Sequence, residues 1–364
     1  MTGALYIGLM SGTSLDGVDA VLADLGGARP RLLADRHLAF DAALREELLA
    51  LNARGDNEIE RAALAGNALA RRYARAAAEV MTAARTPASA VRAIGCHGQT
   101  IRHRPGLGFT TQIGNAALLA ELTGLRVVAD FRSRDVAAGG QGAPLAPAFH
   151  AAVFSDPTED RVALNLGGIA NLSVLPRDGA VTGFDSGPGN CLLDLWAARH
   201  LGRPVDEDGA WAAGGRPIAT LLERLLALPY LAAPPPKSTG RDLFNASWLQ
   251  DMLAGGEDPQ AVQATLLEFT ARSVADAVAR HGRGARRLIV CGGGAKNGAL
   301  LRRLAALVAP ATLETSNRHG IDPQLVEAAC FAWLAMRALE DAPGNLPAVT
   351  GARGPRVLGA LYPP

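Results

Sequence analysis

The sequence has very little lysine and no clustered cysteine. Only two of its 364 residues are lysine, Lys237 and Lys296, so arginine fills the routine cationic positions. The four cysteines are scattered without CxxC spacing, which indicates neither a zinc site nor a disulfide framework. We expect them to be small buried groups in a reducing compartment, the cytoplasm.

A strong net charge and long apolar runs are also missing. The formal net charge is +1, so the composition favours neither nucleic acid nor an anionic membrane as a partner. No apolar run approaches the roughly 20 residues that span a bilayer, and the first residues do not form a signal-peptide pattern. The length suits two domains with a cleft between them.

The first informative stretch is GLMSGTSLDGVD, residues 8–19, behind a short apolar run. Glycines and hydroxyl side chains after a strand expose backbone N–H groups, which together suit a polyphosphate. Asp16 and Asp19 add carboxylates that suit a magnesium ion. The apolar alternation then resumes, so we predict the tip of a β-hairpin and not a Walker loop. An ordinary polar turn is the alternative for this loop taken alone.

Residues 161–185 repeat this pattern about one domain later. RVALNLGG is an apolar strand ending in glycines, and IANLSVLP is the return strand. Two glycine-tipped hairpins indicate duplicated halves that face each other. Asp185 follows at a predicted strand end, before Gly187-Pro188-Gly189 and a helix, which makes it the candidate base beside the phosphates. A simple N-cap role is the alternative for this acid.

Three further segments combine glycine with polar groups. Residues 287–308 read as strand, triple glycine and helix, where an adenosine can lie on the backbone with its phosphates towards the helix N-terminus. His97 and Gln99 follow a predicted strand at 93–96. The loop 130–142 is rich in glycine and charge, and serves either a ligand or an interdomain crossover. Both lysines lie in or beside glycine-containing loops, where a compact ammonium suits an anion.

Taken together, these motifs resemble the actin, sugar-kinase and heat-shock chaperone ATPase superfamily. Within it, the chain resembles the anhydro-N-acetylmuramic acid kinase family most closely. The motifs occur in order along nearly the whole chain, with Asp-Ser-Gly at 185–187 for the usual Asp-Thr-Gly and Asp242 for the usual Glu. They are GLMSGTSLDGVD, GCHGQT, DFRSRDVAAGGQGAPLAP, LNLGGIANLS, GFDSGPGN, KSTGRDLFN, CGGGAKN and a GID…EA segment.

The resemblance implies an α/β, two-domain actin-like ATPase fold, which is ribonuclease-H-like, with a central ATP cleft between duplicated halves. The first domain would comprise residues 1–130 plus about 340–364, and the second 131–339. It also implies a homodimer and a peptidoglycan-recycling reaction. ATP, magnesium and water would convert 1,6-anhydro-N-acetylmuramic acid into N-acetylmuramic acid 6-phosphate, with Asp185 deprotonating the water.

The expected site residues fall into three sets. The nucleotide set is Gly12, Thr13, Ser14, Leu15, Asp16, Gly17, Val18, Asp19, Gly167, Gly168, Asn171, Gly292, Gly293, Gly294, Lys296 and Asn297. The substrate set is His97, Gln99, Gln112, Asn115, Lys237 and Glu327. The metal set is Asp16 and Asp19.

Two other functions are compatible with these motifs. One is a different sugar kinase of the superfamily that acts on a free hydroxyl, without water as a substrate. The other is a chaperone-like ATPase or a sugar-sensing regulator. No helix-turn-helix precedes the first hairpin, which disfavours the regulator.

Overall fold

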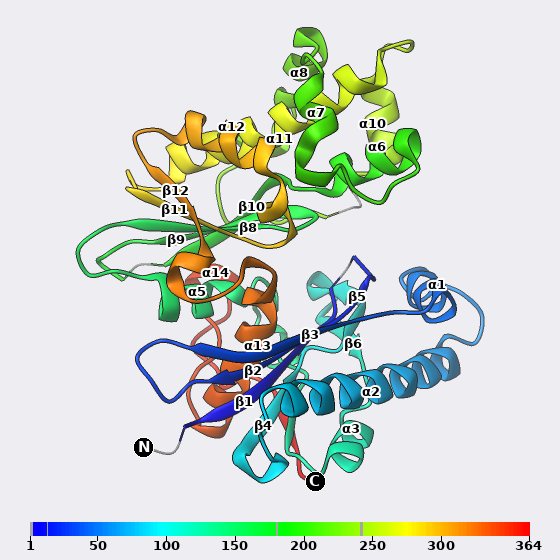
Figure 1. Ribbon diagram of the computed structural model, residues 1–364, viewed down its shortest axis with the longest axis vertical. Coiled ribbons are helices and arrows are strands. Elements are labelled where there is room, and N and C mark those ends of the chain that lie inside the picture. Colours follow the sequence, from blue (N-terminus) through cyan, green and yellow to red (C-terminus); the bar gives the residue numbers. More distant parts are fainter. Residues whose placement is uncertain (1–2, 13, 180, 241–242) are drawn as a thin grey trace. The chain divides into compact units, whose positions relative to one another are not determined.

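The computed structural model describes residues 3–12, 14–179, 181–240 and 243–364. Two compact units make up the chain, Met1–Phe149 with Leu325–Pro364, and His150–Gln324 (Figure 1). Each unit is built on its own β-sheet with helices packed against it. The α/β class expected from the sequence is therefore confirmed.

The first unit contains a six-stranded sheet in the order β13-β7-β4-β1-β2-β3. Strand β1 pairs antiparallel with β2 and parallel with β4, β4 continues parallel to β7, and β3 and β13 close the edges in antiparallel pairing. A separate hairpin joins β5 and β6. The strands are β1 Leu5–Met10, β2 Gly17–Asp24, β3 Arg31–Ala39, β4 Val91–Cys96, β5 Gln99–Arg104, β6 Phe109–Ile113, β7 Val127–Ala129 and β13 Ala360–Tyr362.

Helices cover both faces of this sheet. On one face, α2 packs its buried Leu69, Tyr73 and Val80 against the apolar side of β1, β2 and β4. On the other face lies α13, which contacts β1 and β4. The helices are α1 Ala42–Ala50, α2 Glu58–Ala83, α3 Ala116–Thr123, α4 Ser133–Ala137, α13 Val326–Leu339 and α14 Pro347–Thr350, with short 3₁₀ turns at Ala88–Ala90 and Pro105–Leu107. Helix α5, Ala146–Phe154, begins in the first unit and ends in the second.

The second unit contains a five-stranded sheet in the order β10-β9-β8-β11-β12. Strands β8, β9 and β10 form an antiparallel meander, and β11 and β12 extend parallel to β8. The strands are β8 Arg161–Leu166, β9 Ile169–Leu175, β10 Thr182–Pro188, β11 Arg287–Cys291 and β12 Thr312–Thr315. The order and directions match those of β3-β2-β1-β4-β7 in the first unit, so the duplicated, ribonuclease-H-like halves are confirmed at the level of topology.

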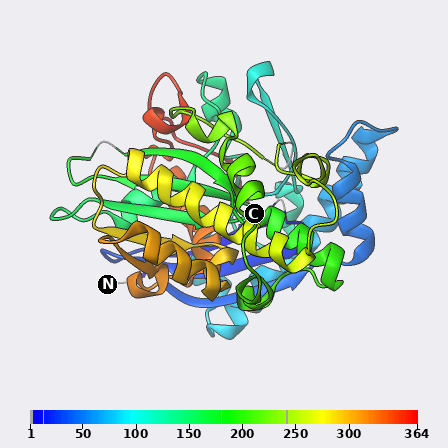
Figure 2. The ribbon, with the colours of Figure 1, turned by 90° about the horizontal axis from the view of Figure 1, so that it is seen from above.

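Two long helices cover one face of the second sheet. Figure 2 shows α11 and α12 side by side over the strands, and their buried residues form one core with those of β8, β9 and β11. The helices are α6 Cys191–Leu201, α7 Ala210–Gly214, α8 Ala219–Leu226, α9 Pro229–Ala232, α10 Ala246–Met252, α11 Pro259–His281 and α12 Gly298–Val308. Short 3₁₀ turns lie at Glu207–Gly209, Gly293–Lys296, Ser316–His319 and Pro323–Leu325.

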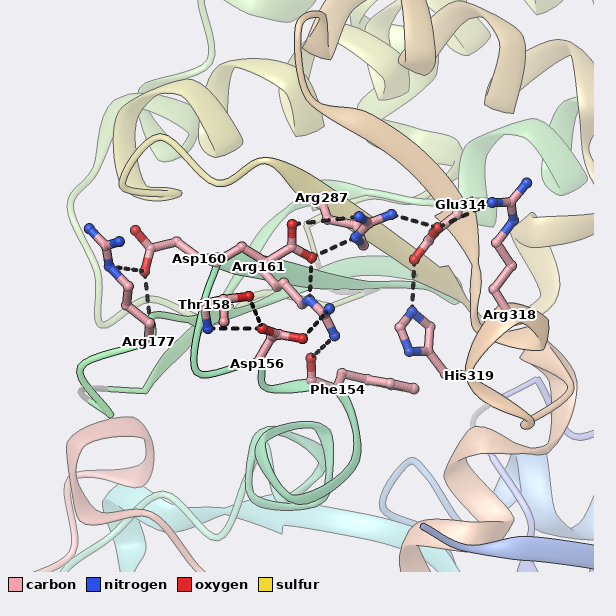
Figure 3. A network of polar contacts seen from close by, with 11 residues as sticks. Phe154, Asp156, Thr158, Asp160, Arg161, Arg177, Arg287, Glu314, Arg318 and His319 are labelled. Atoms are coloured by element: carbon pink, nitrogen blue, oxygen red, sulfur yellow. Dashed lines mark hydrogen bonds and ion pairs between the residues drawn. The ribbon is translucent and has the colours of Figure 1, made fainter. Parts of the chain in front are cut away.

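Charged side chains connect the starts of β8 and β11 to the end of β12 (Figure 3). Arg161 binds Asp156 and Glu159, and Arg287 joins Glu159 to Glu314, with N–O distances of 2.6–2.9 Å. Because β8 runs from Arg161 towards the glycine-tipped turn, this network lies at the end of β8 opposite that turn. It stabilises the sheet without occupying the candidate site.

The compact units differ from the expected domain boundaries at residues 131–149 and 325–339, which belong to the first unit. For residues 325–339, the packing of α13 gives the physical reason. A Cβ atom at Gly8 would overlap the carbonyl oxygen of Ala328, and one at Gly95 would overlap that of Phe331. Helix α13 therefore lies directly on the backbone of β1 and β4, and its sequence position does not reveal this contact.

Candidate functional site

The first hairpin forms as predicted, with its tip between β1 and β2. Met10 pairs with Asp19 across the hairpin. The Ser11 hydroxyl is buried, lies 2.7 Å from the Tyr73 hydroxyl and donates to the carbonyl of Gly98. Gln99 donates from Nε2 to the Gly12 carbonyl at 3.1 Å. Gly98 and Gln99, which follow β4, therefore hold the hairpin tip in place through these hydrogen bonds.

The two carboxylates of this hairpin have different surroundings. Asp16 is exposed, and its Oδ1 accepts a hydrogen bond from Ser14 Oγ at 2.7 Å. Asp19 Oδ1 lies 2.8 Å from His37 Nδ1 on β3. Within the described residues, no three His, Cys, Asp or Glu side chains form a metal-binding group. Two carboxylates still suit Mg²⁺, because this ion commonly takes one or two carboxylates and completes its shell with water and phosphate oxygens.

The other expected nucleotide positions of this loop are Leu15, Gly17 and Val18. All three are buried, and a Cβ atom at Gly17 would overlap the Leu38 carbonyl oxygen on β3. The Leu15 and Val18 side chains thus belong to the core, and only backbone atoms of these three residues remain candidates for a nucleotide contact. Thr13, and Asp242 of the later KSTGRD motif, lie outside the described residues.

His97 forms a buried pair with Arg132. Arg132 donates to His97 Nε2 from Nη2 at 3.0 Å and to the Gly142 carbonyl from Nη1 at 2.8 Å. His97 Nε2 is therefore an acceptor, which places the proton on Nδ1, 3.2 Å from the Ser11 carbonyl. Burial, with the Arg132 charge, lowers the pKa of His97 to about 3, so the ring is neutral. Burial also lowers the pKa of Arg132, while the charge of Glu327 on α13 raises it.

Gln112 and Asn115 make hydrogen bonds to other residues of the first unit. Gln112 Nε2 donates to the hydroxyls of Thr100 and Thr110, which ties β5 to β6. Asn115 caps α3 through the Leu118 N–H and donates from Nδ2 to Asn67. These contacts give the amide nitrogens of both side chains a structural partner, whereas Gln112 Oε1 is buried without a hydrogen-bond partner among the described residues. His97, Gln99 and Glu327 are the expected substrate residues grouped near the first loop by hydrogen bonds or charge.

The second hairpin also forms as predicted, with Gly167 and Gly168 at its tip. Their carbonyl oxygens accept hydrogen bonds of 2.9–3.1 Å from the N–H groups of Gly189, Asn190 and Cys191 at the start of α6. A Cβ atom at Gly189 would overlap the Gly167 carbonyl oxygen, which explains the glycine after Pro188. The beginning of α6 thus fixes the peptide planes of the hairpin tip.

Asp185 lies on β10 opposite Asn171 of β9, where the strand pairing shifts register. Its Oδ1 accepts a hydrogen bond from Asn171 Nδ2 at 2.8 Å, and its Oδ2 accepts one from the Thr239 N–H at 3.0 Å. Burial raises the pKa of Asp185, and the Asn171, Thr239 and Lys237 contacts oppose that rise. The result is a fixed carboxylate that takes up a proton more readily than an ordinary aspartate. Asn171, expected at the nucleotide, thus contacts the candidate base.

The sequence suggests an anion contact for Lys237, and in the structure its ammonium binds backbone carbonyls. Nζ donates to the carbonyls of Tyr230 and Leu231 at 3.0 and 3.1 Å and lies 4.7 Å from the centroid of the Tyr230 ring. These contacts favour a role in holding its loop over a direct contact with substrate. Sequence reasoning missed Tyr230 and Thr239, although Thr239 lies within the KSTGR motif.

The triple-glycine segment follows β11 as predicted. Gly292 has a φ of 83°, and a Cβ atom there would overlap Asn165 Oδ1, so only glycine fits. Gly293–Lys296 form a 3₁₀ turn in which Lys296 is exposed. At the start of α12, the Gly298 and Leu300 N–H groups already donate to Asp208 and Asn297. The glycine backbone is therefore a better candidate nucleotide contact than the N-terminus of α12.

Comparisons with known proteins match the whole chain. A family model described as anhydro-N-acetylmuramic acid kinase matches residues 4–364. The chain belongs to the anhydro-N-acetylmuramic acid kinase family. Relatives carrying that name include proteins from Variovorax paradoxus, 57% identical with full coverage of both chains, and Bordetella petrii, 58% identical over 99% of this chain and 97% of that one. Membership makes the chain an ATP-using kinase that phosphorylates an amino sugar at a hydroxyl group.

Solved structures match more distantly. An activator of 2-hydroxyisocaproyl-CoA dehydratase from Clostridium difficile, with bound ADPNP, is 13% identical over 92% of this chain and 96% of that one, with a TM-score of 0.47. The fold is therefore assigned from the order and directions of the strands in the two sheets, and not from this match. In the described part of the chain, no helix has both the length and the apolar character needed to cross a bilayer.

Proposed function

We propose that the chain uses ATP and water to convert 1,6-anhydro-N-acetylmuramic acid into N-acetylmuramic acid 6-phosphate, with Asp185 as the general base. The substrate follows from family membership and from relatives that share more than half of the sequence along their full length. Water attacks the anomeric carbon, the bond from that carbon to O6 breaks, and O6 accepts the γ-phosphoryl group. Asp185 takes the proton that the water loses, and ADP leaves.

The observation that carries the base assignment is the environment of the Asp185 carboxylate. One donor on each oxygen fixes the carboxylate plane, while burial raises its pKa. A general base works best when its pKa approaches the operating pH, so a raised pKa favours proton abstraction from water. Phosphoryl transfer otherwise needs positioning and charge neutralisation, which backbone N–H groups and magnesium supply.

The proposed ATP contacts lie in three glycine-containing segments, one in the first unit and two in the second. They are the loop 12–19 with its Mg²⁺ carboxylates Asp16 and Asp19, the hairpin tip at Gly167 and Gly168, and the turn 292–297. Magnesium there would neutralise charge on the phosphates. Small residues in these segments let phosphate oxygens and the adenosine approach the backbone. His97, Gln99 and Glu327 are proposed to contact the sugar.

Running the reaction in ¹⁸O-labelled water tests the hydrolytic step. We expect one label in the sugar product, at the anomeric hydroxyl, and none in the phosphate, as read by mass spectrometry at short reaction times. Anomeric hydroxyls exchange slowly with water, so unlabelled product incubated alone in the same water is the control. An unlabelled sugar phosphate would instead indicate a kinase acting on a free hydroxyl.

The compartment and the oligomeric state are proposals too. All four cysteines are buried, which fits small apolar groups in the reducing cytoplasm. The homodimer rests on the resemblance of the sequence to the family, and light scattering coupled to size exclusion tests it. A monomer mass across the micromolar range would overturn it.

A further inference from the structure

Residues 229–240 form a strap along β10, and three of its hydrogen bonds reach Asp185. The Tyr230 hydroxyl donates to the Asp185 carbonyl at 2.8 Å, the Asp185 N–H donates to the Lys237 carbonyl at 3.1 Å, and the Thr239 N–H reaches the carboxylate at 3.0 Å. The strap thus holds both the backbone and the side chain of this residue. Among the described residues, the fourth contact comes from Asn171, on the neighbouring strand β9.

The Lys237 side chain links the two ends of the strap. Its ammonium donates to the Tyr230 and Leu231 carbonyls, at one end of the strap, while its own carbonyl and the Thr239 N–H hold Asp185 at the other end. It also lies over the rings of Tyr230 and Phe184, with distances of 4.7 and 5.9 Å to their centroids. A cation between two carbonyls and two aromatic faces is held firmly in a half-buried position.

We propose that Lys237 and Tyr230 are positioning residues for the base, keeping the Thr239 N–H on the Asp185 carboxylate and thereby setting the pH at which Asp185 becomes active. The inference rests on the proposed role of Asp185 in catalysis. It assigns Lys237 to the base and not to the phosphates or the sugar. It also gives Tyr230, which no sequence motif marks, a part in the reaction.

The charged groups around the strap determine the direction of the effect. The Lys237 charge lowers the pKa of Asp185. Burial and the Arg280 charge lower the pKa of Lys237, and the Asp185 charge opposes that shift. Arg280 and His281 lie at the end of α11 and face Lys237. Burial and the Lys237 charge lower the pKa of His281. Burial and the Asp185 charge together raise the pKa of Tyr230, so its hydroxyl stays protonated as a donor. Removing the Lys237 cation should therefore raise the pKa of Asp185 further.

The test is the pH profile of kcat/KM for Lys237→Met. Because Asp185 acts in its deprotonated form, a higher pKa moves the acidic limb to higher pH, by about 0.5–1 pH unit for one lost cation at this range. KM for ATP and for the sugar should stay within about twofold. Lys237→Arg keeps the charge, so its acidic limb should lie at least half-way back from the Lys237→Met position to the wild-type position. Tyr230→Phe should shift the acidic limb in the same direction as Lys237→Met, by a smaller amount.

Arg283→Met is the matched control, since it removes an exposed cation of the same unit that pairs with Asp178. It should leave the profile unchanged. An unshifted acidic limb in Lys237→Met, or a raised KM for ATP with an unshifted limb, overturns the inference. If Lys237→Met does not fold, as judged by circular dichroism, the limb of Tyr230→Phe decides alone. Asp185→Asn separates the two claims: near-normal turnover in that variant refutes the proposed base itself, whatever Lys237 does.

Discussion

A donor on each oxygen gives the Asp185 carboxylate one orientation. Donors stabilise its charged form, whereas burial opposes charging, and the raised pKa indicates that burial is the larger effect. Asparagine would keep the size of the side chain and lose the basic oxygen. The Asp185→Asn variant therefore isolates proton transfer from packing.

We expect Asp185→Asn to lower kcat by about 10²–10⁴-fold, the range typical for loss of a general base. Nucleotide affinity, measured by isothermal titration calorimetry, should stay within about twofold, because the glycine-containing segments are unchanged. Asp178→Asn, which replaces an exposed acid paired with Arg283, controls for the lost charge. Turnover near the wild-type rate would remove Asp185 from the role of base.

At the scale of elements, α13 and the first sheet show how two glycines determine packing. Gly8 of β1 and Gly95 of β4 are neighbours in parallel register and face the backbone of α13. The opposite face of the same strands carries Ile7, Leu9 and Ile94, which pack against α2. Large side chains cover one face of these strands, and glycines lie on the other. Helix α13 can therefore approach the strand backbone more closely than α2 does.

Gly8→Ala and Gly95→Ala should each lower the free energy of unfolding of the first unit by about 2–4 kcal/mol, because a backbone carbonyl would have to move to admit the methyl group. Gly106→Ala is the matched control, since a Cβ atom there has open space around it. Thermal unfolding followed by circular dichroism gives the comparison. Equal midpoints for Gly8→Ala and Gly106→Ala would contradict the close approach.

Local signals in the sequence predict several elements to the residue. Asn115 and Gly124 bound α3, Asp258 and Pro259 start α11, and the glycine-tipped hairpins lie where the alternating pattern indicates. Caps and turns are predictable because their physics is contained within a few neighbouring residues. The strap contacts of Tyr230 and Lys237 depend on tertiary structure, so no local pattern reveals that this ammonium faces carbonyls.

For the whole molecule, each of the two units contains a buried histidine with a lowered pKa. His97 in the first unit and His150 in the second are both buried, the latter with Nδ1 2.8 Å from Ser173 Oγ. Burial lowers the pKa of His150 to about 4 and contributes most to lowering that of His97 to about 3, from an ordinary value of 6.5. Each unit therefore folds around a neutral imidazole that the unfolded chain would protonate at mildly acidic pH.

Acid should therefore destabilise both units. Below pH 6.5 each histidine binds a proton in the unfolded chain but not in the folded chain. The free energy of unfolding therefore has its full value above that pH and decreases below it. It falls by up to about 1.4 kcal/mol per pH unit per histidine, until the folded pKa of about 4 or 3 is reached. The free energy of unfolding measured in urea should accordingly decrease by about 2 kcal/mol for each histidine between pH 7 and 5.

His150→Gln should flatten this dependence of the free energy of unfolding on pH, while His200→Gln, which replaces an exposed histidine, should leave it closer to wild type. Parallel slopes for wild type and His150→Gln would mean that His150 is protonated in the folded chain as readily as in the unfolded one.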